Sequence, residues 1–416
     1  MAEEAKLYMR NYGQMPKLLL GQEIHLSDST LRDGAQMPGI AMTKKQQLGI
    51  FDYLHRVGID KIELFMLDDF YRNITLEMLG RGYEKPEVTG WARSDRKDID
   101  GVRLVESIKE VGILMSVSDS HIYDKMNLTR EEAKRKYIDA FNYALDKGLR
   151  ARCHLEDITK ADMNFVLPFV EELLKRDPDV MIRVCDTVGL GLPFPEEILK
   201  YSGYSPAFGI PGIVTKLKEI GVTNIEMHTH DDYGLAVANT LAGLLYGANW
   251  ASLTFLGIGE RAGNSELEKV LAFVNIRAGV DRYNLECLTE FADYMEKESI
   301  IYIPRNKAVV GKNVFAVSSG IHAAAIRKAP FTYEPFSPET VGNERKFLLG
   351  PTSGLDIVLA EVNNRLTERS LKLVEDKRDT RIGKVLEAVK DQFRNGRRSD
   401  ISPDELDALI NKYVLV

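Results

Sequence analysis

Residues 129–157 read TREEAKRKYIDAFNYALDKGLRARCHLED and contain one complete helix–strand unit. Thr129, followed three residues later by Glu132, predicts a capping box, in which two side chains satisfy free backbone N–H groups at the start of a helix. Gly148 is placed to end that helix, because glycine readily adopts the left-handed conformation found after many helices. The run RARCHLED (150–157) that follows is a candidate β-strand.

The same alternation of helix and strand occurs eight times from residue 23 onward, which favours a parallel α/β fold. Eight units in roughly 255 residues is the size of a (β/α)8 TIM barrel. An open doubly wound sheet is the alternative, but no G-x-G-x-x-G motif follows the first strand, so nucleotide binding has no support. We also expect five glycines to end helices before the next strand: Gly58, Gly112, Gly148, Gly221 and Gly247. The other candidate strands are EIHLSDS (23–29), KIELFM (61–66), EVTGWA (87–92), ILMSVSDS (113–120), VMIRVCDT (180–187), NIEMHTH (224–230) and ASLTFLGIG (251–259).

The composition is that of a globular protein without a nucleic-acid surface. The 416 residues carry a formal net charge of −7, and we find no stripe of Lys and Arg that would attract a nucleic acid. The three cysteines are widely spaced and odd in number, so no disulfide framework is expected. The sequence shows neither a signal peptide nor an apolar run long enough to span a bilayer. We therefore expect a cytoplasmic protein with no membrane partner.

Charged and polar residues recur where the candidate strands end. Active sites of TIM barrels lie at this C-terminal end of the strands. One such residue could be a satisfied polar group of the core, but a set spread over all eight strands predicts an active site. The set comprises Arg32, Asp33, Glu63, Arg93, Asp119, His121, Glu156, Asp157, Asp186, Thr187, Glu226, His228, His230 and the loop GIGERAGNS (257–265).

Two histidines, His228 and His230, are separated by one residue in the seventh candidate strand. Side chains at positions i and i+2 of a strand share a face, so both imidazoles and Glu226 are expected to point the same way. Asp33 is the best candidate for a third ligand, because only strand eight separates strands one and seven in a closed barrel. Two histidines and one carboxylate with open coordination positions suit a divalent metal. Non-haem iron oxygenases use the same ligands, but the barrel pattern disfavours that reaction.

Four motifs together resemble the DRE-TIM metallolyases: STLRDGAQ (29–36), the Glu63 of KIELFM, IEMHTHDD (225–232) and LGIGERAGN (256–264). That family includes 2-isopropylmalate, homocitrate and Re-type citrate synthases and 3-hydroxy-3-methylglutaryl-CoA lyase. Residues 303–354 are similar to the lid subdomain of the synthases. The resemblance therefore covers roughly residues 23–355 and implies a TIM barrel followed by a mainly helical lid.

The resemblance implies a metal site and an electrostatic partner. Asp33, His228 and His230 would bind a divalent ion (Mn, Zn, Co or Mg), with Asn264 nearby. The family's naming triad falls on Asp33, Arg32 and Glu63, and Arg32 would steady negative charge on the reacting oxygen. Ala35 departs from the family, because the synthases often carry glutamate at this position.

The resemblance to this family also implies the reaction, a Claisen-type condensation of acetyl-CoA with a 2-oxo acid. Thr187 and Arg93 would hold the carboxylate of the 2-oxo acid, and His121 and Gln36 would line the pocket. A base must take a proton from the acetyl methyl group. We expect His322, assisted by Glu226 or Tyr333, to be that base. In the family the lid reaches over the partner subunit, which implies a homodimer with exchanged lids.

Several alternatives remain. The lyases carry a catalytic cysteine in the loop after strand eight, and residues 257–265 contain none. An aldolase would lack the lid, and a non-catalytic metabolite-binding barrel is a third possibility. The stretches GYEKPEVTGWAR (82–93) and RVCDTVGLGLPFP (183–195) look most like Re-type citrate synthases, which use oxaloacetate. The 2-isopropylmalate, homocitrate, citramalate and phosphinomethylmalate synthases are the alternatives within the branch.

The predicted organisation has four parts: an N-terminal extension (1–22), a TIM-barrel catalytic domain (23–280), a linker and lid subdomain (281–355) and a helical C-terminal subdomain (356–416). In the last part, Ser402 and Glu405 form a predicted capping box with Pro403 in the first turn. This part is too short for an appended amino-acid-sensing domain, so feedback control by leucine is not expected.

Overall fold

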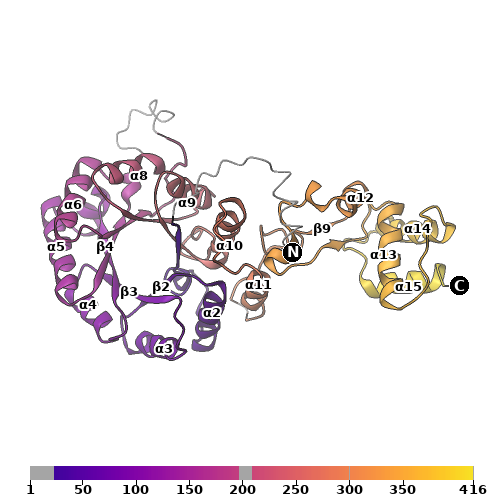
Figure 1. Ribbon diagram of the computed structural model, residues 1–416, viewed down its shortest axis with the longest axis horizontal. Helices are drawn as coiled ribbons and strands as arrows, with labels where there is room; N and C mark the ends of the chain where they lie inside the picture. The colour runs from indigo at the N-terminus through magenta and orange to yellow at the C-terminus, as the bar shows by residue number, and fades with distance from the viewer. Residues whose placement is uncertain (1–22, 196–208, 299, 416) are drawn as a thin grey trace. The chain divides into compact units, whose positions relative to one another are not determined.

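The computed structural model describes residues 23–195, 209–298 and 300–415 and shows two compact units (Figure 1). One unit ends at Tyr302 and the other begins at Ile303. The predicted N-terminal extension, residues 1–22, lies outside the described residues. The first unit continues past residue 280, the predicted end of the barrel domain, because α11 (Leu288–Lys297) packs against α2 (Lys44–Val57).

Eight parallel strands close into a barrel, each hydrogen-bonded to the next in chain order and β8 to β1. This confirms the predicted (β/α)8 barrel. The strands are β1 (His25–Asp28), β2 (Lys61–Phe65), β3 (Glu87–Arg93), β4 (Glu110–Ser116), β5 (Arg150–Glu156), β6 (Met181–Asp186), β7 (Asn224–Thr229) and β8 (Trp250–Leu253).

Helices surround the barrel on its outside (Figure 1). The predicted capping box of α5 is present, since Thr129 and Glu132 exchange hydrogen bonds with each other's backbone N–H groups. Gly58 ends α2 in the left-handed conformation, with φ 84°. The other α-helices among the described residues of this unit are α3 (Asp69–Leu79), α4 (Arg96–Arg103), α5 (Arg130–Asp146), α6 (Met163–Arg176), α8 (Ile210–Glu219), α9 (Ala236–Leu245) and α10 (Leu267–Ala272).

Three predicted details are wrong. Gly112 does not end a helix, because it lies inside β4, which begins at Glu110 rather than at residue 113. β4 also ends at Ser116, so Asp119 and His121 lie beyond the strand in or beside a short helical turn (Ser120–Lys125). β8 ends at Leu253 instead of residue 259, because the chain turns at Leu256, whose φ is 61°.

The two faces of the strands bury different side chains. In β5, Cys153 and Leu155 are buried on one face, while Arg152 and His154 alternate with them on the other. Arg152 lies within 3.7 Å of carboxylates on β2 and β7, so its face is the barrel interior. The outer faces of the strands are apolar and meet the helices, as expected of parallel sheets covered by helices. The interior of this barrel is therefore polar.

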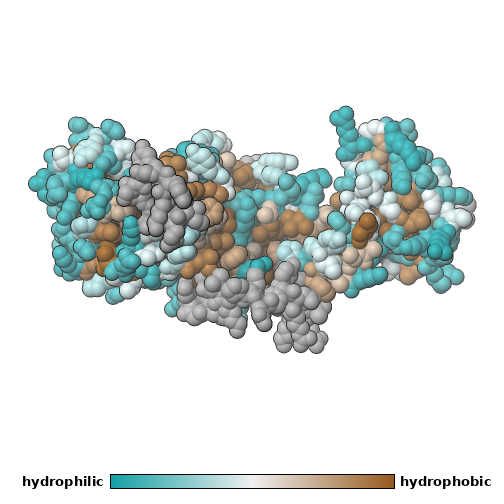
Figure 2. Space-filling model, turned by 90° about the horizontal axis from the view of Figure 1, so that it is seen from above, coloured by the Kyte–Doolittle hydropathy of each residue, from teal (hydrophilic) through white to brown (hydrophobic). Residues whose placement is uncertain are grey.

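The second unit is mainly helical with a two-stranded parallel sheet of β9 (Ala316–Val317) and β10 (Lys346–Phe347). Its core is apolar and includes Val362, Leu366 and Ile382, none of which is exposed. On the face seen in Figure 2, hydrophilic side chains cover much of the outer surface of its helices. These helices are α12 (Gly320–Lys328), α13 (Leu355–Glu368), α14 (Thr380–Arg394) and α15 (Pro403–Tyr413), the last with the predicted Ser402–Glu405 capping box. In the described ranges of both units, no helix is long and apolar enough to cross a membrane.

Candidate metal centre and active site

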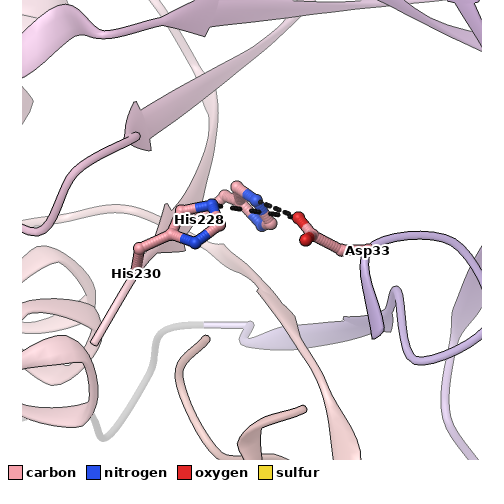
Figure 3. Close-up of side chains that lie close together, drawn as sticks. All are labelled: Asp33, His228 and His230. Atoms are coloured by element: carbon pink, nitrogen blue, oxygen red, sulfur yellow. Dashed lines mark ion pairs between the residues drawn. The ribbon is translucent and has the colours of Figure 1, made fainter. Parts of the chain in front are cut away.

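Asp33, His228 and His230 converge at the C-terminal mouth of the barrel (Figure 3). Asp33 follows β1, His228 lies in β7 and His230 is the first residue after β7. Asp33 Oδ2 lies 3.1 Å from His228 Nε2 and 3.9 Å from His230 Nε2. The three ligand atoms all lie within 4.8 Å of one another. The structure thus brings together the residues that the sequence suggested as metal ligands.

The ionisation of the three groups suits a cation. Burial would raise the pKa of Asp33, but Arg32 and the two histidines lower it well below its usual value. Burial lowers the pKa of His228, and burial with the neighbouring His228 lowers the pKa of His230 to about 4. A carboxylate and two neutral imidazoles are the forms that bind metals. Ser252 Oγ lies 3.3 Å from His228 Nδ1, so the other nitrogen of that ring also has a partner.

Arg32 connects this centre to Glu63. Its Nη1 donates to Asp33 Oδ2 at 3.1 Å and its Nε donates to Glu63 Oε1 at 2.8 Å. Within the described part of the chain its Nη2 makes no hydrogen bond. One guanidinium donor therefore remains available at the metal centre.

Asn264 lies beside His230 because the loop after β8 folds back onto the barrel. Residues 230 and 264 form an isolated β-bridge. The fold-back requires glycine at residue 263, since φ there is 92° and a Cβ atom would collide with the carbonyl oxygen of Gly257. Asn264 is buried, and its Oδ1 has no hydrogen-bond partner among the residues described. An unpaired buried acceptor next to a metal site fits a role in metal or water binding.

Two of the four predicted substrate residues, Thr187 and His121, lie beyond the ends of β6 and β4 and contact residues at the end of β5. Thr187 Oγ1 accepts a hydrogen bond from the backbone N–H of Asp157 at 2.8 Å. His121 Nδ1 lies 3.2 Å from Glu156 Oε2. These contacts hold both side chains in place without a ligand.

The other two predicted substrate residues, Arg93 and Gln36, are more exposed. Arg93 is paired with Asp98 through two hydrogen bonds of 2.7 and 2.9 Å. Gln36 is exposed at the end of a short turn, Gly34–Gln36. Their roles in substrate binding stay predictions.

His322 and Tyr333 belong to the second unit, where both are exposed and their ring centroids lie 4.2 Å apart. Their predicted roles involve both units and stay predictions. Glu226, the third member of the expected base, is fully buried in the barrel. Its Oε1 accepts a hydrogen bond from Ser27 at 2.5 Å and its Oε2 one from Arg183 at 2.6 Å.

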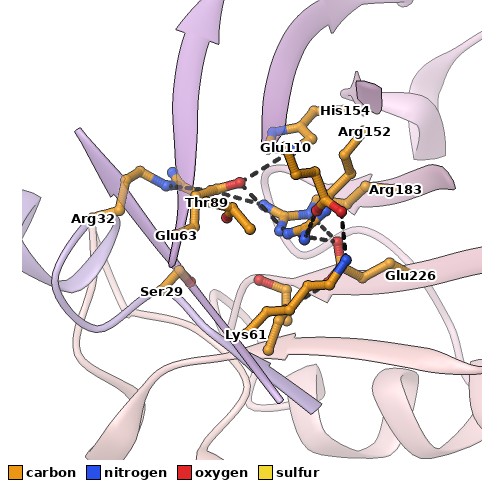
Figure 4. Close-up of polar contacts among 12 residues, drawn as sticks. Ser29, Arg32, Lys61, Glu63, Thr89, Glu110, Arg152, His154, Arg183 and Glu226 are labelled. Carbon is orange, nitrogen blue, oxygen red and sulfur yellow. Dashed lines mark hydrogen bonds and ion pairs between the residues drawn. The ribbon is translucent and has the colours of Figure 1, made fainter. Parts of the chain in front are cut away.

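Buried charged residues extend from Arg32 into the barrel interior (Figure 4), and sequence reasoning missed four of them: Lys61, Glu110, Arg152 and Arg183. Ion pairs link them in an order in which the charge alternates, from the C-terminal mouth to the opposite end of the barrel. We call this set the interior charge chain; its members in order are Asp33, Arg32, Glu63, Arg183, Glu226, Arg152, Glu110 and Lys61. The alternation of Arg152, His154 and Glu156 in β5 is the signal that could have revealed it.

The geometry can polarise and stabilise an oxygen that gains negative charge. A divalent ion on two imidazoles and a carboxylate keeps open coordination positions. The free donor of Arg32 adds a fixed positive charge in a buried setting, where electrostatic interactions are strong. Condensation and cleavage next to a carbonyl both need such stabilisation, so the geometry alone fits either direction.

Comparisons with known proteins identify the family. A family model described as HMGL-like matches residues 23–295, and one described as homocitrate synthase post-HMGL domain-like matches residues 309–393. The Citrate (Re)-synthase of Clostridium kluyveri is 37% identical in an alignment that covers 99% of this chain and 92% of that protein. A probable 2-isopropylmalate synthase of Ignicoccus hospitalis is 35% identical over 88% of this chain and 94% of that protein.

Among solved structures, the HMG-CoA lyase of Bacillus subtilis has the same fold. Its TM-score is 0.57 at 19% identity, over 69% of this chain and 98% of that chain. The lyase covers 69% of this chain, whereas the second family model and the two synthases extend into the second unit. The chain therefore belongs to the HMGL-like family and, within it, to the DRE-TIM synthases, the acyltransferases that condense acetyl-CoA with 2-oxo acids.

Proposed function

We propose that the protein condenses acetyl-CoA with oxaloacetate and releases citrate and free CoA, with a divalent metal ion bound at the mouth of the barrel. The observation that carries the proposal is the convergence of Asp33, His228 and His230 beside the free donor of Arg32. Oxaloacetate is supported by the citrate (Re)-synthase relative, whose similarity extends over 99% of the chain.

The residues of the barrel mouth would prepare the 2-oxo acid for attack. Asp33, His228 and His230 would hold the metal ion, which when bound supplies Lewis-acid polarisation of the keto group. Arg32 would donate from Nη2 to the same oxygen as its negative charge develops, an interaction that is stronger in the transition state than in the ground state. Thr187 and Arg93 would hold the adjacent carboxylate, with His121 and Gln36 at the pocket wall.

The second unit would supply the base. The acetyl methyl group is a weak carbon acid, so His322, with Tyr333 against its ring, would take the proton. The methyl carbon then forms a bond to the keto carbon, and the keto oxygen becomes a hydroxyl group by taking up a proton. Water cleaves the thioester and CoA leaves as the thiol. A homodimer with exchanged lids and a cytoplasmic location are further parts of this proposal.

The choice of 2-oxo acid is testable by release of CoA thiol. We would incubate the purified protein with acetyl-CoA, Mn²⁺ and, separately, oxaloacetate, 2-oxoisovalerate, 2-oxoglutarate or pyruvate. The proposal expects the highest kcat/KM with oxaloacetate, citrate as the product, and loss of activity with a chelator. A higher value with 2-oxoisovalerate or 2-oxoglutarate would assign a 2-isopropylmalate or homocitrate synthase instead. No thiol release with any of the four acids would refute the synthase assignment.

A further inference from the structure

Arg183 occupies the centre of the interior charge chain. Its Nη1 donates to Glu63 Oε1 at 2.9 Å and its Nε donates to Glu226 Oε2 at 2.6 Å. Arg32 Nε donates to the same oxygen, Glu63 Oε1, at 2.8 Å. One oxygen of the Glu63 carboxylate is thus shared by two guanidinium groups. One belongs to Arg32, beside the metal ligands, and the other to Arg183, which lies three residues before the end of β6.

Glu63 is also confined on its other side. His154 Nε2 lies 3.2 Å from Glu63 Oε2, and the neighbouring strand carries Gly112 at this level. A Cβ atom at residue 112 would lie 2.7 Å from Glu63 Oε2 and still closer to His154. Glu63 itself is fully buried. The position of this carboxylate is therefore set by Arg183 and Arg32 on one side and by His154 and the missing side chain on the other.

We propose that Arg183 is a positioning residue that fixes the Glu63 carboxylate, and through it the guanidinium of Arg32, in the orientation that leaves Nη2 free for the reacting oxygen. This inference rests on the proposed function for the identity of the reacting oxygen. Arg183 itself does not contact the metal ligands in the described structure; its recorded ion-pair partners are Glu63 and Glu226.

The physical argument is one of charge balance. A buried carboxylate stays ionised only if positive groups offset its desolvation. Burial raises the pKa of Glu63, while Arg183, His154, Arg32 and other neighbours together lower it well below its usual value. Without Arg183, Glu63 would bind a proton more readily and would hold Arg32 less strongly. Arg32 would then be free to turn toward Asp33, its other partner.

The test compares two buried cations at different depths. Arg183→Gln removes the positioning contact, and Lys61→Gln is the matched control, because Lys61 pairs with Glu110 at the opposite end of the same chain. Both variants remove one buried positive charge, so both are expected to lower the melting temperature. We expect Arg183→Gln alone to lower kcat on the order of 10–100-fold, with KM for acetyl-CoA within about twofold.

Two readouts separate positioning from a loss of stability. In Arg183→Gln, kcat should fall more steeply toward acid pH than in the unaltered protein, because Glu63, which faces Arg32, His154 and Arg152, binds a proton more readily without Arg183. Lys61→Gln should keep the pH profile of the unaltered protein. Titration with Mn²⁺ should still show one site in both variants, since neither residue contacts a metal ligand.

Arg183→Lys decides the matter if the glutamine variant does not fold. Lysine keeps the charge but, as a compact point charge, does not reproduce the two-sided contact of the guanidinium. We expect a melting temperature near that of the unaltered protein and a kcat roughly 10-fold lower. Folded Arg183 variants with kcat within twofold of the unaltered protein would overturn the inference.

Failure of the proposed function is distinguishable from failure of the inference. If the unaltered protein releases no thiol with any 2-oxo acid, the function fails, and crystal structures of the unaltered protein and of Arg183→Lys then decide the positioning role. Displacement of Arg32 Nε from Glu63 Oε1 in the lysine variant supports it. Retention of the 2.8 Å contact in that variant contradicts it.

Discussion

The interior of the barrel and the core of the second unit bury opposite kinds of side chain. The barrel interior holds charged residues such as Glu63, Arg183 and Glu226, all fully buried, whereas the core of the second unit holds residues such as Val362 and Leu366. Apolar burial stabilises a fold directly, at about 25 cal/mol per Å². Buried ion pairs add little net stability, because desolvation offsets their attraction. The charged interior is therefore better explained by what it holds in place at the barrel mouth than by stability.

The largest expected effect is on kcat and follows from substitutions among the predicted metal ligands at the barrel mouth. Asp33→Ala or His228→Ala should lower kcat by roughly 10³-fold or more, because each removes one of the three groups that can bind the metal. The circular dichroism spectrum should stay that of the unaltered protein. Asp146→Ala is the control, since Asp146 is exposed and paired with Arg176 on the helices outside the barrel. Near-normal turnover in either ligand variant would refute the metal assignment.

The second prediction compares one substitution in each core. Arg152→Met should lower the free energy of unfolding of the barrel by about 3–5 kcal/mol, because Glu110 and Glu226 each lose one of the cations that offset their burial. Leu366→Ala should lower that of the second unit by about 2–5 kcal/mol, because it leaves a cavity.

Calorimetry of the whole chain would measure both changes. Leu373→Ala is the control for the apolar core, because Leu373 is half-exposed. If Arg152→Met were as stable as the unaltered protein, the interior charges would be solvated rather than paired, and the contrast between the two cores would be lost.

The third prediction concerns the pH dependence of the stability of the barrel. Burial and the adjacent Arg183 lower the pKa of His154 to about 3. Below pH 6.5, His154 binds a proton in the unfolded chain but stays neutral in the folded barrel. His154 therefore contributes stability that is complete above pH 6.5 and is lost at up to about 1.4 kcal/mol per pH unit as the pH falls toward 3. With a chelator present, His154→Gln should flatten the dependence of barrel stability on pH in that range; an unchanged slope would contradict it.

In the second unit one carboxyl group acts with the opposite sign. Burial raises the pKa of Glu361 to about 7. The folded state holds a proton there that the unfolded state has released, so this contribution is complete below pH 4.5 and is lost as the pH rises through 7. Glu361→Gln should stabilise the second unit at pH 8 and leave it unchanged at pH 4. Equal effects at the two pH values would show that Glu361 is solvated.

The smallest effects concern the helix caps, one in each unit. Thr129→Ala and Ser402→Ala should each cost about 1 kcal/mol, because each leaves a backbone N–H group at a helix start without its acceptor. Each should shift only the unfolding transition of its own unit, measured by calorimetry. A shift of both transitions by one substitution would show that the units unfold together.

Local patterns in the sequence predicted the features that depend on neighbouring residues. Both capping boxes and the face shared by His228 and His230 follow from a spacing of two or three residues, and the order of strands follows from the alternation of helices and strands along the chain. Asp33 could be added because the closed barrel brings β1 near β7.

The features that were missed depend on partners distant in the chain. The sequence suggested that Gly112 ends a helix, but it lies in β4. Glycine is required there because a Cβ atom would collide with His154 of β5 and Glu63 of β2. Arg183 and Glu226 meet across 43 residues, and Glu63 and Arg183 across 120. The alternation in β5 indicates that Arg152 and His154 share a face, but no pattern in a single sequence identifies their distant partners, which only the three-dimensional structure shows.

The interior charge chain joins side chains from β2, β4, β5, β6 and β7 to Arg32, just after β1. If a single β-strand detached from the barrel, it would leave a buried charged side chain inside without its counter-ion. Partial opening is therefore costly, and amide hydrogens of these strands should exchange with deuterium only when the whole barrel unfolds. Slow and uniform exchange would show that the strands form a rigid base for the barrel mouth. The loops at the mouth could then vary in sequence without disturbing the strands.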